Sequence, residues 1–170
     1  MTIVAALAIG AGGVACDELD QSLDSSPAPT RASTPGATPV LRDGRASVEL
    51  RGDARGLHLF GTLTEPITYG GPDAPLSLVW RSESFDLFTL GGEVRLGEQP
   101  TSETLRVQLA VEVDGEVIAF ASDAGECVVT VREAEPRSFA GSIDCEGLLG
   151  GDPEREVDAS GTFEAASRHA

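Results

Sequence analysis

Short runs of alternating apolar and polar residues, separated by Gly, Pro and Asp, fill the chain from residue 45 onward. The clearest runs are residues 105–113 and 116–122, which meet at Asp114-Gly115. Strand side chains alternate between the two faces of a sheet, and Asp-Gly is a favoured two-residue hairpin turn. The pattern predicts a hairpin with one apolar face, in which Val111 lies opposite Ile118.

A second hairpin is predicted in residues 127–145, where two strand-like runs flank a polar turn at residues 133–137. If the hairpin is symmetric about Pro136, Cys127 lies opposite Cys145. The same register places both sulfurs on one apolar face, because alternate side chains of a strand share a face. We therefore predict a disulfide between Cys127 and Cys145, a bond that persists in an oxidising compartment.

Further strand-like segments lie on both sides of these hairpins, at residues 46–50, 57–63, 76–80, 85–90 and 157–165. No segment shows the apolar period of an ordinary helix. About nine or ten short strands in one domain predict an all-β fold, an antiparallel two-sheet β-sandwich. A meander that closes into a β-barrel or half-barrel is the alternative, because only long-range pairing separates the two architectures.

The first residues predict export. Residues 1–15 form an apolar stretch that ends in small residues and is too short to span a bilayer, which is typical of a signal peptide. The sequence Gly13-Val14-Ala15-Cys16 resembles the lipobox of bacterial lipoproteins. The resemblance implies cleavage before Cys16, acylation of that cysteine, and a place on the cell membrane or in the envelope. A secreted protein cut after Ala15 is the alternative.

The cysteine count agrees with lipidation. The chain has three cysteines, and a bond between Cys127 and Cys145 leaves Cys16 as the odd thiol. An odd thiol in an exported protein indicates another partner or a modification. Several acyl chains, with each buried CH₂ contributing about 0.8 kcal/mol, would hold the protein on a membrane without a spanning helix.

Residues 16–44 are rich in Ser, Thr, Pro, Ala and Asp and have no sustained apolar period. A segment of this composition buries too little apolar area to offset its ordering entropy, and its prolines stiffen it. We predict a lipid-anchored, disordered linker over these residues and a single all-β domain over residues 45–167.

Charge and aromatic content limit the partners. All 12 basic residues are arginine, and the formal net charge is −16. A field of this sign opposes phosphate, so we predict no nucleic-acid partner, and a well-solvated surface is the preferred explanation of the acidity. A carbohydrate-stacking platform is limited to Trp80 or Tyr69, although an isolated Trp in a strand more often belongs to a core.

Candidate catalytic residues are few. The two histidines are His58, in a predicted strand, and His169, one residue from the end of the sequence. The sequence has no Gly-x-Ser-x-Gly, His-Glu-x-x-His or Cys-x-x-Cys motif and no phosphate-binding glycine loop. We therefore predict that the protein is not an enzyme and has no catalytic residues, metal site or cofactor.

Three polar segments match binding motifs in composition only. Residues 123–126 and 150–154 combine carboxylates with glycine, as calcium loops do, but neither has the spacing of an EF-hand. Residues 51–53 read Arg-Gly-Asp, the composition of an integrin-recognition tripeptide. Ordinary turn chemistry is the preferred explanation of all three.

Two functions fit these observations. The preferred one is a membrane-tethered envelope lipoprotein, a non-catalytic β-sandwich that presents loops or a sheet edge to a protein or glycan partner. The alternative is a carrier that encloses a small apolar ligand in a barrel or half-barrel. Packing separates them, because a carrier needs a ligand-sized apolar cavity on the order of 300–1,000 Å³, whereas a sandwich is filled.

Overall fold

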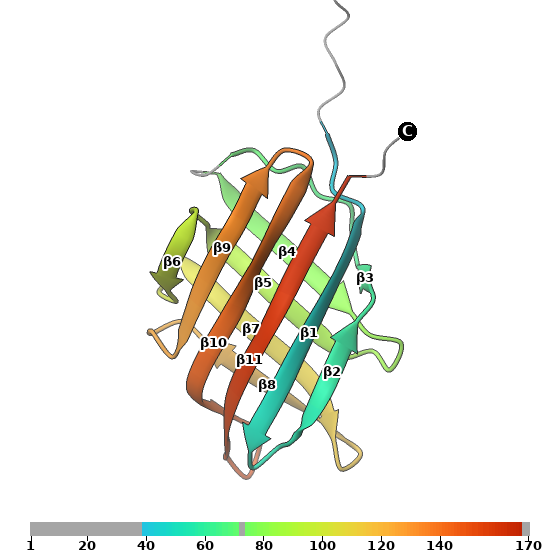
Figure 1. Cartoon of the computed structure of the whole chain (residues 1–170). Coiled ribbons are helices and arrows are strands. Elements are labelled where there is room, and N and C mark those ends of the chain that lie inside the picture. Colours follow the sequence, from blue (N-terminus) through green and yellow to red (C-terminus); the bar gives the residue numbers. More distant parts are fainter. Residues whose placement is uncertain (1–38, 72–73, 168–170) are drawn as a thin grey trace, which may run out of the picture. The chain divides into compact units, whose positions relative to one another are not determined.

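The computed structural model of the protein describes residues 39–71 and 74–167. Cys16, residues 1–15 and most of the predicted linker lie outside them. Eleven strands make up the regular structure of the described residues (Figure 1). Their bounds are β1 Asp43–Gly52, β2 Gly56–Phe60, β3 Thr62–Leu63, β4 Pro75–Arg81, β5 Leu87–Glu93, β6 Gly97–Pro100, β7 Leu105–Val113, β8 Glu116–Ser122, β9 Cys127–Glu135, β10 Ser138–Gly150 and β11 Arg155–Ala166.

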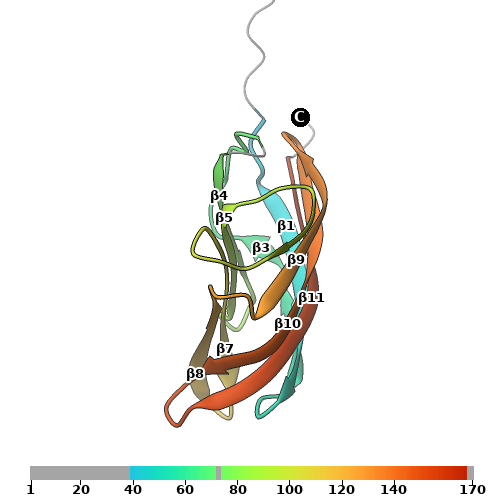
Figure 2. The same ribbon diagram turned by 90° about the vertical axis from the view of Figure 1, so that its left-hand side faces the viewer.

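All eleven strands belong to one hydrogen-bonded sheet, whose main order is β2-β1-β11-β10-β8-β7-β5-β4-β3. β9 pairs with β10, and β6 pairs with β9. The sheet folds over on itself, so that β1, β2, β9, β10 and β11 form a layer in front of β4, β5, β7 and β8 (Figures 1 and 2). The two layers are joined where Gly150 at the end of β10 pairs with Phe120 of β8.

This topology confirms the all-β antiparallel class and corrects the two-sheet sandwich. The layers are parts of one nearly closed, barrel-like sheet, which fits the barrel or half-barrel alternative better. The physical reason lies in β10, which bulges between Cys145 and Leu148. Gly147 takes a φ of 65° there, and a bulge bends a strand. β10 therefore reaches the second layer instead of ending in the first.

The hairpin of β7 and β8 has the predicted register, with Val111 opposite Ile118. Its turn residues, Asp114 and Gly115, have φ values of 54° and 84°. A type I′ turn requires positive φ at both central positions, which Asp and Gly tolerate. Local turn chemistry therefore determines this hairpin.

The hairpin of β9 and β10 confirms the predicted disulfide but differs at its turn. Cys127 lies opposite Cys145 and is bonded to it, and both residues are buried. The turn consists of Pro136 and Arg137, so the hairpin is not symmetric about Pro136. One extra residue in β9, Arg132, shifts the register between the turn and the cysteines. This bulge restores the pairing that the symmetric arrangement predicted for the cysteines.

The space between the layers is occupied by an aromatic cluster. Trp80 stacks on Phe88 with 5.1 Å between ring centroids, and Phe139 stacks on Phe163 at 5.7 Å. Tyr69 lies 5.8 Å from Phe139, also between centroids. Trp80 and Tyr69 are both buried. They are therefore core residues rather than carbohydrate-stacking platforms.

The fold begins before residue 45, where the composition placed the start of the domain. Leu41 is fully buried, and its backbone exchanges hydrogen bonds of 2.7 and 2.9 Å with Ile67. β1 itself begins at Asp43. Leu41 and the first residues of β1 therefore pack with the rest of the described residues ahead of residue 45.

Loss of the disulfide is expected to destabilise the fold. The bond joins residues with a sequence separation of 18, for which the chain-entropy model gives about 3 kcal/mol of stabilisation. The Cys127→Ala/Cys145→Ala variant should lose about that much free energy of unfolding in urea, and wild-type protein in reducing buffer should behave like it. Labelling of Cys127 or Cys145 by a thiol reagent in the native, unreduced protein would contradict the bond.

Gly141 is expected to tolerate no side chain. A Cβ at this position would lie 2.4 Å from the carbonyl oxygen of Thr130 and 2.5 Å from Cζ of Phe163. Overpacking of this kind costs about 1–3 kcal/mol, so Gly141→Ala should lower the free energy of unfolding by that amount. Gly61→Ala is the control, because nothing lies within 4 Å of its added Cβ. Similar losses in both variants would disprove the packing argument.

Candidate functional site

The edge of the sheet at β2 is the first part of the candidate site. β2 ends the strand order and pairs with β1 alone among the described strands. Leu57 and Leu59 point outward and are 65% and 63% exposed, whereas His58 and Phe60 point inward. Natural edge strands usually carry lysine, proline or a bulge that blocks further pairing. β2 has none of these features.

A cleft of about 1380 Å³ opens beside β2. Residues 57–62 form one wall, and the facing wall is formed by Arg81 at the end of β4, the β4–β5 loop (residues 82–86) and Glu112. The cleft continues over the outer faces of β1 and β11, past Arg45, Thr162 and Glu164. Its volume exceeds the roughly 300–1,000 Å³ of small-molecule pockets. The cleft is therefore large enough for a segment of polypeptide.

Phe85 adds a third apolar side chain to this cleft. It is 74% exposed and has a φ of 70°, a conformation that is uncommon for a bulky residue. The guanidinium of Arg81 lies 5.6 Å from the centre of its ring, within the range of a cation–π contact. Leu57, Leu59 and Phe85 thus form an exposed apolar surface around one cleft, and such surfaces mark interaction sites.

His58 and Asp86 connect the two walls of the cleft. His58 Nδ1 lies 3.1 Å from Oδ2 of the buried Asp86 carboxylate. The backbone N–H of Glu112 donates to Oδ1 at 2.9 Å, and the Ser84 hydroxyl donates to Oδ2 at 3.3 Å. Burial raises the pKa of Asp86, but the hydrogen bonds from Glu112, His58 and Ser84 and the charge of His58 together lower it below its ordinary value. Asp86 is therefore a charged group that holds the β4–β5 loop against β2.

The His58–Asp86 pair is the part of the site that the sequence analysis missed. Its members lie 28 positions apart, on different layers, so spacing carried no signal for it. A histidine held by a buried carboxylate also occurs in catalytic triads, which need a hydroxyl at the other ring nitrogen. Ser82 and Ser84 instead bond to each other, and Ser84 donates to Asp86. This arrangement positions a loop and contains no triad among the described residues.

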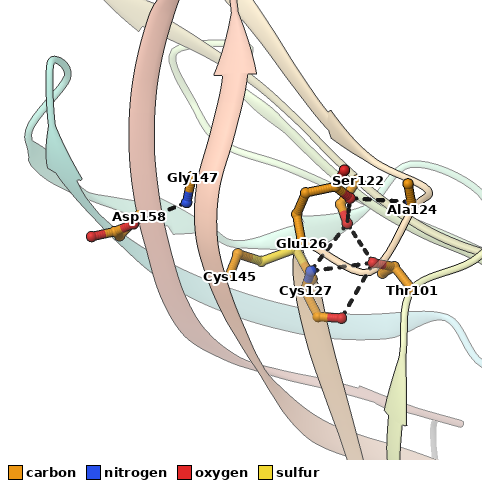
Figure 3. Close-up of a disulfide and its surroundings, with 8 residues drawn as sticks. All are labelled: Thr101, Ser122, Ala124, Glu126, Cys127, Cys145, Gly147 and Asp158. Carbon is orange, nitrogen blue, oxygen red and sulfur yellow. Dashed lines mark hydrogen bonds between the residues drawn. A yellow bond between two sulfur atoms is a disulfide. The ribbon is translucent and has the colours of Figure 1, made fainter.

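The polar loop before Cys127 closes on itself (Figure 3). The Cys127 N–H donates to the hydroxyls of Thr101 and Ser122 at 3.2 and 3.1 Å. The Glu126 carboxylate accepts from the Ser122 hydroxyl at 2.8 Å and from the Ala124 N–H at 3.1 Å. Its own backbone N–H, Ser122 and Ala124 lower the pKa of Glu126. The Glu126 carboxylate therefore stabilises the loop that precedes Cys127.

The other binding motifs of the sequence have structural roles or lie outside the described residues. Arg51 pairs with Glu49 at 3.0 Å, and Asp53 accepts the Glu156 N–H at 3.0 Å. The Arg-Gly-Asp tripeptide is therefore part of a strand end and turn. His169 lies outside the described residues. Within those residues, no group of three or more His, Cys, Asp and Glu side chains is arranged to hold a metal ion.

Comparisons of this chain with protein families, curated proteins and solved structures give no significant match. None of the described residues forms a helix with the length and apolar character needed to cross a bilayer.

The contact between Asp86 and His58 predicts a pH-dependent stability. Because the folded pKa of Asp86 lies below its unfolded value of about 3.9, its stabilisation is complete above about pH 4 and is lost as the pH falls through the folded value. Asp86→Asn should lower the free energy of unfolding by about 1–3 kcal/mol at neutral pH. The difference from wild type should shrink in urea titrations below about pH 4.

Glu83→Gln is the matched control for this prediction, because Glu83 is an exposed carboxylate in the same loop. It should change the free energy of unfolding by less than about 0.5 kcal/mol. A difference between wild type and Asp86→Asn that stays constant down to the lowest pH would contradict the role assigned to the charged carboxylate.

Proposed function

We propose that the protein is an exported, lipid-anchored envelope protein that holds a non-catalytic β-domain at a membrane surface and presents the β2 edge to a protein partner. The lipobox-like residues that end at Cys16 support the anchor. The Cys127–Cys145 disulfide supports an oxidising compartment. The Ser-, Thr- and Pro-rich composition of the segment after Cys16 supports a spacer between lipid and domain.

The observation that carries the binding role is the unpaired, apolar edge at β2. Leu57, Leu59 and Phe85 are large apolar side chains exposed around one cleft. An exposed apolar surface of this kind marks an interaction site. At an edge strand it lies beside unpaired backbone N–H and C=O groups, which can pair with a strand of another chain. A protein partner is favoured over a glycan, because Trp80 and Tyr69 are buried in the core.

The carrier alternative receives less support from the packing. A carrier with a barrel-like sheet needs free space between its layers for the ligand. Here the rings of Trp80, Phe88, Phe139 and Phe163 pack against one another in that space, with centroid separations of 5.1–6.2 Å. The 1380 Å³ cleft lies at the edge of the sheet and is lined by charged as well as apolar residues.

Removal of the acylation site tests the anchor. Cys16→Ser should move the protein from the membrane fraction to the soluble fraction, since no acyl chain would then hold it at the bilayer. Fractionation followed by immunodetection measures the change. The Cys127→Ala/Cys145→Ala variant is the control and should stay with the membrane, because it keeps Cys16. Unchanged membrane retention of Cys16→Ser would disprove the lipid anchor.

A further inference from the structure

We propose that β2 accepts an extended peptide segment of the partner as an added strand, and that this segment alternates apolar and basic residues. The inference rests on the proposed function and names the chemistry of its partner. Addition of a strand to an exposed sheet edge is a recurrent mode of peptide recognition, in which backbone hydrogen bonds supply affinity and side chains supply specificity.

The backbone of β2 is positioned for this pairing. β1 occupies one side of β2, and no described strand pairs with the other side. Residues 57–60 of β2 line the cleft, and residues 82–86 of the β4–β5 loop line its facing wall. Beyond β2, Gly61 and Thr62 already pair with Arg81 of β4. A strand laid along β2 would therefore enter existing space, with the His58–Asp86 contact holding the facing loop in place.

The outward side chains of β2 select apolar residues in the added strand. Leu57 and Leu59 lie on the outer face of the sheet. Side chains of neighbouring strands stand about 4.5–5.5 Å apart on the same face, so a partner's outward residues would lie against these leucines. Apolar residues there would cover surface that is now exposed to water, which is favourable in proportion to the area removed.

The inward side chains of the added strand would lie toward the wall of the cleft that the β4–β5 loop forms. Glu83 and Glu112 line the cleft, and no described cation lies within ion-pair distance of either. Three arginines also line the cleft: Arg45 pairs with Glu164, Arg81 lies over Phe85, and Arg132 donates to the Gly141 carbonyl oxygen. Basic residues at the inward positions would therefore meet charges of opposite sign that still lack a cation.

The overall charge favours such a partner over a second copy of this chain. The formal net charge of −16 repels another molecule of the same sequence and attracts a basic segment. Both effects decrease with salt, because mobile ions screen surface charges over about 10 Å at 0.1 M ionic strength. Binding of a basic segment should therefore weaken as salt is added, whereas self-association would strengthen.

The test uses the purified full-length protein and two blocked, fluorescently labelled peptides as probes. One has the sequence Val-Lys-Val-Lys-Val-Lys-Val, and the other replaces each Lys by Glu. Fluorescence anisotropy should show binding of the lysine peptide, weakened by salt, and no binding of the glutamate peptide. Hydrogen exchange should slow at the β2 amides when the lysine peptide is added.

Two variants assign the binding to this edge. Leu57→Lys/Leu59→Lys should abolish it, and Glu83→Gln/Glu112→Gln should weaken it by about three- to tenfold, as expected for two exposed charge contacts. Glu98→Gln/Glu103→Gln removes two exposed carboxylates that do not line the cleft and is the matched control. If the leucine variant does not fold, the two glutamine variants still decide the question.

Several outcomes would overturn the inference. They are equal binding of the two peptides, equal effects of the two glutamine variants, and slowed exchange at strands other than β2. Self-association of the protein that strengthens with salt and is lost in Leu57→Lys/Leu59→Lys would assign the edge to a second copy instead. Each of these results leaves the membrane fractionation of Cys16→Ser unaffected, so the anchor and the strand addition fail independently.

Discussion

The structure depends on one strand that belongs to both layers. β10 pairs with β11 along most of its length, is bonded to β9 through the buried Cys127–Cys145 disulfide, and reaches β8 through Gly150. The bulge at Gly147 provides the bend that this path requires. Because β10 turns the sheet back on itself, the apolar faces of both layers cover each other around the rings of Trp80 and Phe163.

The same closure leaves an edge open on the opposite side. The front layer ends at β2 and the back layer ends at β3, with the β4–β5 loop beside β2. There the His58–Asp86 contact joins β2 to the β4–β5 loop, and directly after β2 the Gly61 N–H donates to the Arg81 carbonyl oxygen and β3 pairs with β4. β2 is therefore an edge strand with two exposed leucines, to which an incoming strand would add.

Local pairing was predictable from the sequence because its causes are local. Asp114 and Gly115 determine a type I′ turn, and alternation of side chains determines which residues of β7 and β8 face the core. The cysteine pairing was predicted correctly although the turn beside it was not, because the extra residue Arg132 offsets the position of the two-residue turn. The buried positions of Trp80 and Tyr69 also follow the general preference of aromatic residues for a core.

The sequence by itself determined the strand class, the two hairpins and the disulfide, since each arises from residues close in the chain or from the period of a strand. Only the tertiary structure decided that the layers form one sheet, that Asp86 meets His58, and that Leu57, Leu59 and Phe85 surround one cleft. These features depend on which distant strands lie side by side. Alternation reports the face of a side chain and carries no information about the neighbouring strand.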